Sequence, residues 1–151
     1  MYRRWHRPAR VLVVEDNPTD VKLLQMGLDQ IQSPFVLEVA TDGKEAIAAL
    51  RRTAQDSDIL ESPDLVLLDL NLPGMDGHEV LRIIRADSQL ALIPVIVWTC
   101  SISGRDILSA YRAGANSYVP KPHSVDETLD LVRTLHHYWL ELSLLPSSVR
   151  S

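Results

Sequence analysis

Short apolar runs recur along the chain, and each one stops at a polar or charged residue. Three of them cover residues 11–14, 65–68 and 95–98. A continuous apolar run of this length is typical of a strand buried on both faces, as in a parallel sheet covered by helices. Residues 35–39 alternate instead, which predicts a strand nearer an edge, and residues 117–120 predict a short fifth strand.

The stretches between these runs carry apolar residues at helical spacing, as Val21, Leu24 and Leu28 do after the first run. Residues 53–63 are polar and predict a loop. Each helical stretch opens with a capping residue and an acid three positions later: Asn17 and Asp20, Asp42 and Glu45, Asp76 and Glu79, Ser103 and Asp106, Ser124 and Glu127. Strand and helix therefore alternate five times. We predict an α/β fold, a doubly wound five-stranded parallel sheet in the flavodoxin-like order 2-1-3-4-5 with five helices, the last one extended.

Composition narrows the class of protein. The chain has 151 residues, 46% of them hydrophobic and 23% charged, which is ordinary for one soluble globular domain. A net charge of −5 argues against a nucleic-acid binder, which usually presents a basic face. Cys100 is the single cysteine, so an internal disulfide is excluded and a reducing compartment fits. Without an apolar run of membrane-spanning length or a signal peptide, we expect a cytoplasmic protein with no membrane contact.

Candidate chemistry gathers where the strands end. Glu15, Asp16, Asp69, Thr99 and Lys121 all follow predicted strands, so they share one edge of the sheet, where ligands bind in open α/β folds. Three carboxylates brought together repel one another, and a hard divalent cation such as Mg²⁺ relieves that repulsion. The alternative is that they are three solvated loop acids.

Phosphoryl transfer to an aspartate requires a carboxylate with three groups close to it: Mg²⁺, a lysine and a hydroxyl. Asp69 would attack phosphorus as the nucleophile. The metal and Lys121 would offset negative charge on the phosphoryl oxygens, and Thr99 would hydrogen-bond one of them. The added phosphoryl charge could then reorder nearby loops.

Four motifs stand in order along the chain: VLVVEDNP, VLLDLNLPGMDG, IPVIVWT and SYVPKP. Together they resemble a response-regulator receiver domain over roughly residues 11–132. The resemblance implies that Asp69 accepts a phosphoryl group from a histidine kinase. It implies Mg²⁺ ligation by Glu15, Asp16, Asp69 and the backbone carbonyl of Asn71. Thr99 and Tyr118 match the switch residues, Lys121 matches the family's lysine, and the Lys121–Pro122 peptide bond is expected to be cis.

Three positions depart from the commonest family pattern. Glu15 is longer than the aspartate often found there, so its metal contact could run through water. Trp98 is bulky for the position before the switch residue and could constrain the loop that follows. Pro120 lacks a backbone donor, which an edge strand tolerates.

The two ends of the chain differ from its middle. Residues 1–10 carry four arginines and no acid, so the net charge of the remaining residues is −5 − 4 = −9. This basic arm could touch a partner or be a solvated tail. We expect residues 11–133 to form the receiver domain and residues 134–151 to continue the last helix into a tail. No second domain is expected after it, so the output would pass through protein contacts without DNA.

The apolar repeat of the last helix continues through Leu135, Trp139 and Leu142. Surplus apolar surface at a helix end usually marks an interface, so we expect a homodimer formed by the fourth and fifth helices and the tail. The alternative is that the tail folds back over its own domain. The ending YWLELSLLPS resembles small response regulators that partner bacterial phytochromes. His136 and His137 are adjacent and face different ways, so both are expected to be solvated.

Two other classes of protein share parts of this pattern. An aspartate-nucleophile phosphatase usually has a second aspartate two residues after the first, on its first strand, whereas this chain has Asn71 there, after the third. In a flavodoxin-like cofactor carrier, the flavin phosphate would bind at the first strand–helix turn. Here that turn reads EDNPTD, and its acidic residues would repel a phosphate. The sequence favours a phosphoacceptor switch over an enzyme, with self-phosphorylation and autodephosphorylation as its only chemistry.

Overall fold

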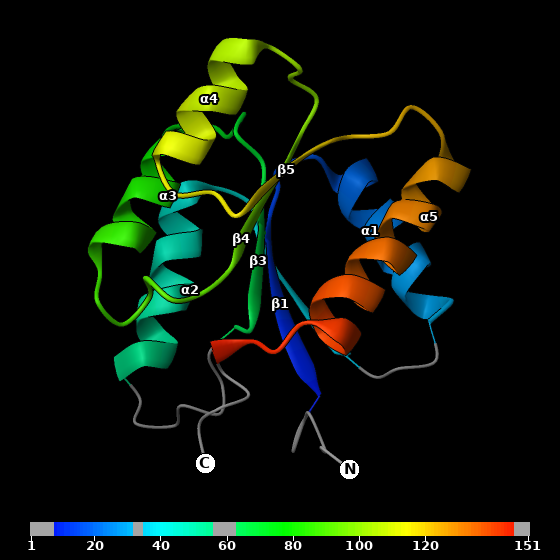
Figure 1. Ribbon diagram of the computed structural model, residues 1–151, viewed down its shortest axis with the longest axis horizontal. Coiled ribbons are helices and arrows are strands. Elements are labelled where there is room, and N and C mark those ends of the chain that lie inside the picture. Colours follow the sequence, from blue (N-terminus) through cyan, green and yellow to red (C-terminus); the bar gives the residue numbers. More distant parts are fainter. Residues whose placement is uncertain (1–7, 32–34, 56–62, 147–151) are drawn as a thin grey trace.

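The computed structural model describes residues 8–31, 35–55 and 63–146. Their centre is one parallel sheet in the order β2-β1-β3-β4-β5, which confirms the predicted topology (Figure 1). The strands are β1 (Ala9–Val14), β2 (Phe35–Ala40), β3 (Leu65–Leu68), β4 (Val95–Thr99) and β5 (Ser117–Pro120). β1 begins two residues before the predicted apolar run because Ala9 and Arg10 pair with Phe35 and Val36 at the edge of the sheet.

Helices cover both faces of the sheet (Figure 1). They are α1 (Pro18–Asp29), α2 (Gly43–Gln55), α3 (Gly77–Ala86), α4 (Gly104–Arg112) and α5 (Val125–Leu135), which continues as the π-helix η2 (His136–Leu142). α2, α3 and α4 lie on one face, and α1 and α5 pack together on the other. α2 ends at Gln55, so the prediction that a loop begins at residue 53 was wrong at its first three residues. The rest of that prediction falls partly on residues 56–62, outside the described residues.

Successive residues of each central strand feed two separate cores. Leu12, Val14, Val66 and Leu68 pack under α2, α3 and α4, whereas their neighbours on the same strands pack under α1 and α5. Side chains along a strand alternate between faces, so a strand covered on both sides is apolar at every position. This is the physical reason for the unbroken apolar runs.

The helix starts follow the predicted caps. The side chains of Asn17, Asp76, Ser103 and Ser124 each accept a hydrogen bond from a backbone N–H in the first turn of the next helix. Asp42 does the same for α2, with its Oδ1 atom 2.7 Å from the Glu45 nitrogen. These bonds satisfy amides that have no partner inside a helix. The caps set where each helix leaves the sheet edge.

The last helix turns back over its own domain. Leu140 and Leu145 are 5% and 2% exposed and belong to the core under α1 and α5. The alternative that the tail covers its own domain is therefore confirmed for these residues, whereas Tyr138, Leu142 and Leu144 stay exposed.

His136 was wrongly expected to be solvated. It is 7% exposed and stacks on Phe35, with ring centroids 5.9 Å apart. It follows Val132 by four positions and so continues the buried face of α5, whereas His137, one position on, is exposed.

Candidate functional site

The acids that follow β1 and β3 meet at the carboxyl edge of the sheet. Val14 and Leu68 are partners in the parallel register, so the residues after them, Glu15 and Asp69, emerge side by side. Both are buried, and Asp16 beside them is exposed. One carboxylate oxygen of each of the three lies within 4.8 Å of the others. The predicted cluster of acids is therefore assembled.

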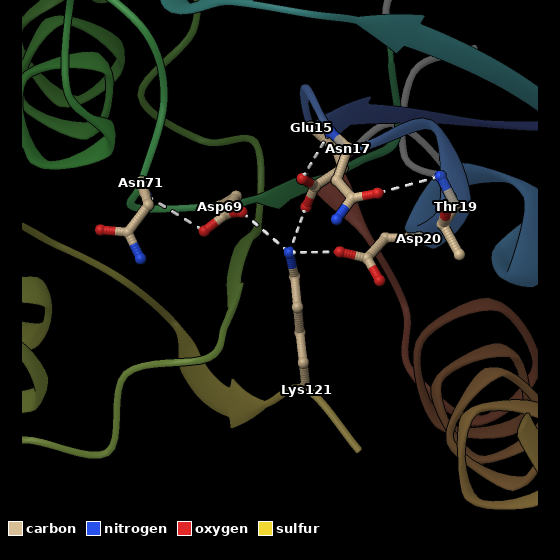
Figure 2. A network of polar contacts seen from close by, with 7 residues as sticks. All are labelled: Glu15, Asn17, Thr19, Asp20, Asp69, Asn71 and Lys121. Atoms are coloured by element: carbon tan, nitrogen blue, oxygen red, sulfur yellow. Dashed lines mark hydrogen bonds and ion pairs between the residues drawn. The ribbon is translucent and has the colours of Figure 1, made fainter. Parts of the chain in front are cut away.

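Lys121 places its ammonium group among these acids (Figure 2). It follows β5, and its Nζ atom is 2.7 Å from Glu15 Oε2 and 2.9 Å from Asp69 Oδ2. A third carboxylate, that of Asp20 in the first turn of α1, lies 2.8 Å from the same nitrogen. Asp20 was not predicted to belong to the site, because an acid three positions after a helix cap has an ordinary role in the first turn.

The electrostatics leave this site short of positive charge. Three carboxylates contact one ammonium group, and Asp16 lies close to two of them. Burial raises the pKa of Glu15 to about 7 even though Lys121 and the Asn17 backbone amide favour its charged form. Burial disfavours the charged form of Lys121, but its bonds to Asp20, Glu15 and Asp69 raise its pKa above the ordinary value. The donor atoms are all oxygen and carry excess negative charge, which is the donor set that Mg²⁺ prefers.

Asp69 is also held from the side of the following loop. The Asn71 backbone N–H donates to Asp69 Oδ1 at 3.1 Å, which orients the carboxylate. Figure 2 shows the Asn71 side chain directed away from Lys121. The donor is the backbone N–H of residue 71 and not its side chain, so the identity of this residue matters little for the hydrogen bond.

Thr99 ends β4 with a buried hydroxyl group that has no hydrogen-bond partner in the described part of the protein. Its side chain is 0% exposed, and its carbonyl accepts from the Lys121 backbone N–H at 2.8 Å. An unpaired buried hydroxyl costs about 1–3 kcal/mol. This hydroxyl is therefore available to an oxygen that enters the site.

Tyr118 does not join the acidic cluster. Its hydroxyl donates to the Ser101 carbonyl at 2.9 Å, in the loop between β4 and α4, and the ring is half-buried. Burial raises the pKa of this hydroxyl, which keeps it a donor. The predicted switch residues therefore both adjoin one loop: Thr99 directly precedes it on β4, and Tyr118 on β5 hydrogen-bonds to Ser101 within it.

Trp98 packs in the core beside the lysine. Its ring is 2% exposed and packs with α1 and α5, and Lys121 Nζ lies 5.0 Å from the ring centroid. A cation above an aromatic face is stabilised by the ring quadrupole.

The predicted cis bond between Lys121 and Pro122 was wrong, since no peptide bond among the described residues is cis. Even before proline the trans form is favoured by about 0.5–1 kcal/mol.

The chain resembles known proteins in both sequence and fold. The family model "Response regulator receiver domain" matches residues 11–133. Response regulator Rcp1 of Synechocystis sp. is 34% identical over 141 residues, which cover 93% of this chain and 95% of the relative.

Among the solved structures that resemble this chain, two match most of its length. One is the phosphorylated cyanobacterial phytochrome response regulator RcpA, 36% identical, with a TM-score of 0.85 and coverage of 93% of this chain and 99% of the other. The Mn²⁺-bound form of Rcp1 is 35% identical, with a TM-score of 0.82 and coverage of 92% and 99%. Within the described ranges, no helix has both the length and the apolar character needed to cross a bilayer.

Proposed function

Because this chain belongs to the response regulator receiver domain family, we propose that it is a phosphoacceptor switch of a two-component system. It would take a phosphoryl group from a histidine kinase onto Asp69, with Mg²⁺ bound by Glu15, Asp16, Asp69 and the Asn71 carbonyl. The output would pass through protein contacts.

One observation carries this proposal. Asp69 holds one oxygen against Lys121 at 2.9 Å and the other against the Asn71 backbone amide at 3.1 Å, beside two more acids, and Thr99 at the end of the neighbouring strand β4 has a buried, unpartnered hydroxyl. A structural salt bridge would need neither the surplus of carboxylates nor the orphaned hydroxyl. The same set suits a nucleophile whose product carries additional negative oxygens.

The chemical step assigns a task to each side chain. One oxygen of Asp69 forms a bond to phosphorus while the bond from phosphorus to the kinase histidine breaks, and that histidine keeps the electron pair. Lys121, released from one of its carboxylates, offsets charge on the phosphoryl oxygens. Mg²⁺, when bound, supplies further positive charge at the same oxygens.

Switching would follow from the unpartnered hydroxyl. Thr99 gains an acceptor when a phosphoryl oxygen appears beside it, and a move of Thr99 pulls on the loop to α4. That loop holds Ser101, whose carbonyl accepts from Tyr118. Tyr118 would therefore exchange partners together with Thr99, which couples Asp69 to the start of α4.

Asp69 is expected to be the only phosphorylation site. Full-length protein treated with acetyl phosphate and Mg²⁺ should gain one phosphoryl group by intact mass, and chelation of the metal should prevent it. Asp69→Asn should remain unmodified, because an amide cannot act as the nucleophile. Full modification of that variant would disprove the assignment, whereas turnover of generic phosphate esters would favour the phosphatase alternative.

We further propose a phytochrome-type histidine kinase as the donor. The solved structures that match most of the chain include a protein described as a cyanobacterial phytochrome response regulator. Transfer from a purified phytochrome-type kinase should be much faster than transfer from an unrelated histidine kinase. Equal rates would remove the support for this partner and leave Asp69 as the acceptor.

A further inference from the structure

A groove of about 820 Å³ runs between α3 and α4. These two helices lie on the sheet face away from α1 and α5 (Figure 1). Four arginines line it: Arg82 and Arg85 on α3, and Arg105 and Arg112 on α4. The remaining lining residues are Ala86, Leu108, Ser109 and Ala113, and none of them is acidic. The groove is therefore a concentrated basic surface on a protein whose net charge is −5.

The positive charge of this groove is not neutralised inside the protein. Arg85 is half-buried and gives its donors to neutral oxygens, the carbonyls of Ala91, Ile93 and Gly114 and the Asn116 side chain, at 2.7–2.9 Å. Arg82, Arg105 and Arg112 are exposed, and no acid within the described ranges forms an ion pair with them.

The middle of the groove is apolar. Leu108 is 55% exposed and lies on α4 between Arg105 and Arg112, three positions after the first and four before the second, so the three residues share one helix face. The two arginines are about 10 Å apart along the helix axis, at 1.5 Å per residue. The small side chains Ala86 and Ala113 leave room beside Leu108.

Near the starts of α3 and α4, the surroundings of the groove are unfavourable for an anionic ligand. An adjoining groove shares Arg82, Arg105 and Ser109 but is also lined by Asp76 and Asp106, at the starts of α3 and α4. These carboxylates repel an anion, so a ligand is confined to the stretch from Arg105 toward Arg112.

The chemistry of the lining selects the ligand class. Guanidinium groups pair with carboxylates and phosphates through two parallel hydrogen bonds. The groove has no aromatic ring to stack a base and no side-chain amide to read one, which argues against a nucleotide. We propose that the α3–α4 groove binds an acidic segment of a partner protein, with carboxylates on either side of an apolar residue. Binding here requires no phosphorylation, so its failure would leave the chemistry of Asp69 untouched.

The probe for this site is a fluorescein-labelled synthetic helical peptide with glutamates seven residues apart and a leucine between them. Its binding to the full chain is measured by fluorescence anisotropy, and its location by amide chemical shifts in α3 and α4. An analogue with glutamine in place of glutamate should bind at least about tenfold more weakly, and added salt should weaken binding of the acidic peptide.

Paired variants make the test specific. Arg105→Glu with Arg112→Glu should weaken peptide binding by about tenfold or more. Lys44→Glu with Arg51→Glu changes net charge equally on exposed positions of α2 and should leave binding unchanged. The proposal is overturned if both double variants lose binding equally, if the peptide leaves the α3 and α4 amides unshifted, or if pyrophosphate binds the groove and the peptide does not.

Discussion

Glu15 is subject to two opposing influences, because burial disfavours its charge and Lys121 favours it. Its side chain is 1% exposed, and burial prevails, raising its pKa from 4.5 to about 7. A group whose pKa is raised by folding binds a proton more tightly in the folded protein than in the unfolded chain. Its contribution to stability is therefore complete below about pH 4.5 and is lost as the pH rises through about 7.

A measurable pH dependence follows for the metal-free protein. Between pH 5 and pH 8 in EDTA, the free energy of unfolding should fall by a contribution on the order of 3 kcal/mol from Glu15. Glu15→Gln cannot titrate and should lose that part of the slope. Chemical denaturation of both proteins across this range measures it. Identical slopes would show that Glu15 titrates near its ordinary value in the folded protein.

Sequence reasoning found most of the site at the residue scale, but not all of it. Glu15, Asp69 and Lys121 were found because each directly follows a strand, and parallel strands bring such residues together. Asp20 was missed, since it reaches Lys121 from a helix and its contact depends on how α1 is placed. The unpartnered state of the Thr99 hydroxyl is equally a property of packing, which no sequence pattern records.

At the scale of the elements, α3 approaches the site so closely that its first residue must be glycine. A Cβ atom at Gly77 would clash with the Asp69 carbonyl oxygen and with the Leu70 backbone, neither of which can move without moving Asp69. Gly104 occupies the same first position in α4 but has open space around it. The two glycines are therefore a matched pair.

Alanine at these two positions should give opposite results. Gly77→Ala should lower the midpoint of thermal unfolding and slow phosphorylation of Asp69 by acetyl phosphate, because β3 or α3 has to shift. Gly104→Ala should be neutral or more stable by about 0.4–1 kcal/mol, through reduced freedom of the unfolded chain. Thermal melts and labelling rates of both variants test this. An unperturbed Gly77→Ala protein would refute the close approach.

Local chemistry accounts for how well the elements were predicted. Each helix start coincided with a side chain that caps it, and each central strand with an unbroken apolar run. Boundaries without such a signal were less accurate, as at the end of α2. The π-helix η2 and the burial of Leu140 were not predicted. The apolar pattern was interpreted with 3.6 residues per turn, which placed Trp139 and Leu142 on the apolar face instead.

For the whole molecule, we propose that residues 11–133 act as the receiver unit and that the segment from residue 134 onward joins it to a second copy. The structure divides that segment in two. Leu140 and Leu145 complete the core under α1 and α5, whereas Leu142 and Leu144 are 60% and 69% exposed. A truncation at Arg133 would therefore remove core residues together with the proposed interface. Residues 1–7, most of the basic arm, lie outside the described residues.

The last prediction is that the protein forms a homodimer through α4, α5 and this outer surface of the tail. Each leucine fully removed from water would contribute roughly 1.5–3 kcal/mol, part of which the entropy of association offsets. Light scattering should give about twice the chain mass of 16.9 kDa. Leu142→Asp with Leu144→Asp should give a monomer, because a charge at the interface would lose its solvation without gaining a partner.

Leu92→Asp is the matched control for the dimer. Leu92 is 63% exposed and lies between α3 and β4, outside the elements proposed to form the interface, so this variant should still dimerise. The variants change only exposed side chains, so they should unfold at midpoints near that of the unmodified protein. Such midpoints would exclude a general loss of structure. If the unmodified chain is monomeric at roughly tens of micromolar, where interfaces of ordinary strength are occupied, the dimer proposal is wrong. The exposed leucines would then be solvated surface on a tail that covers only its own domain.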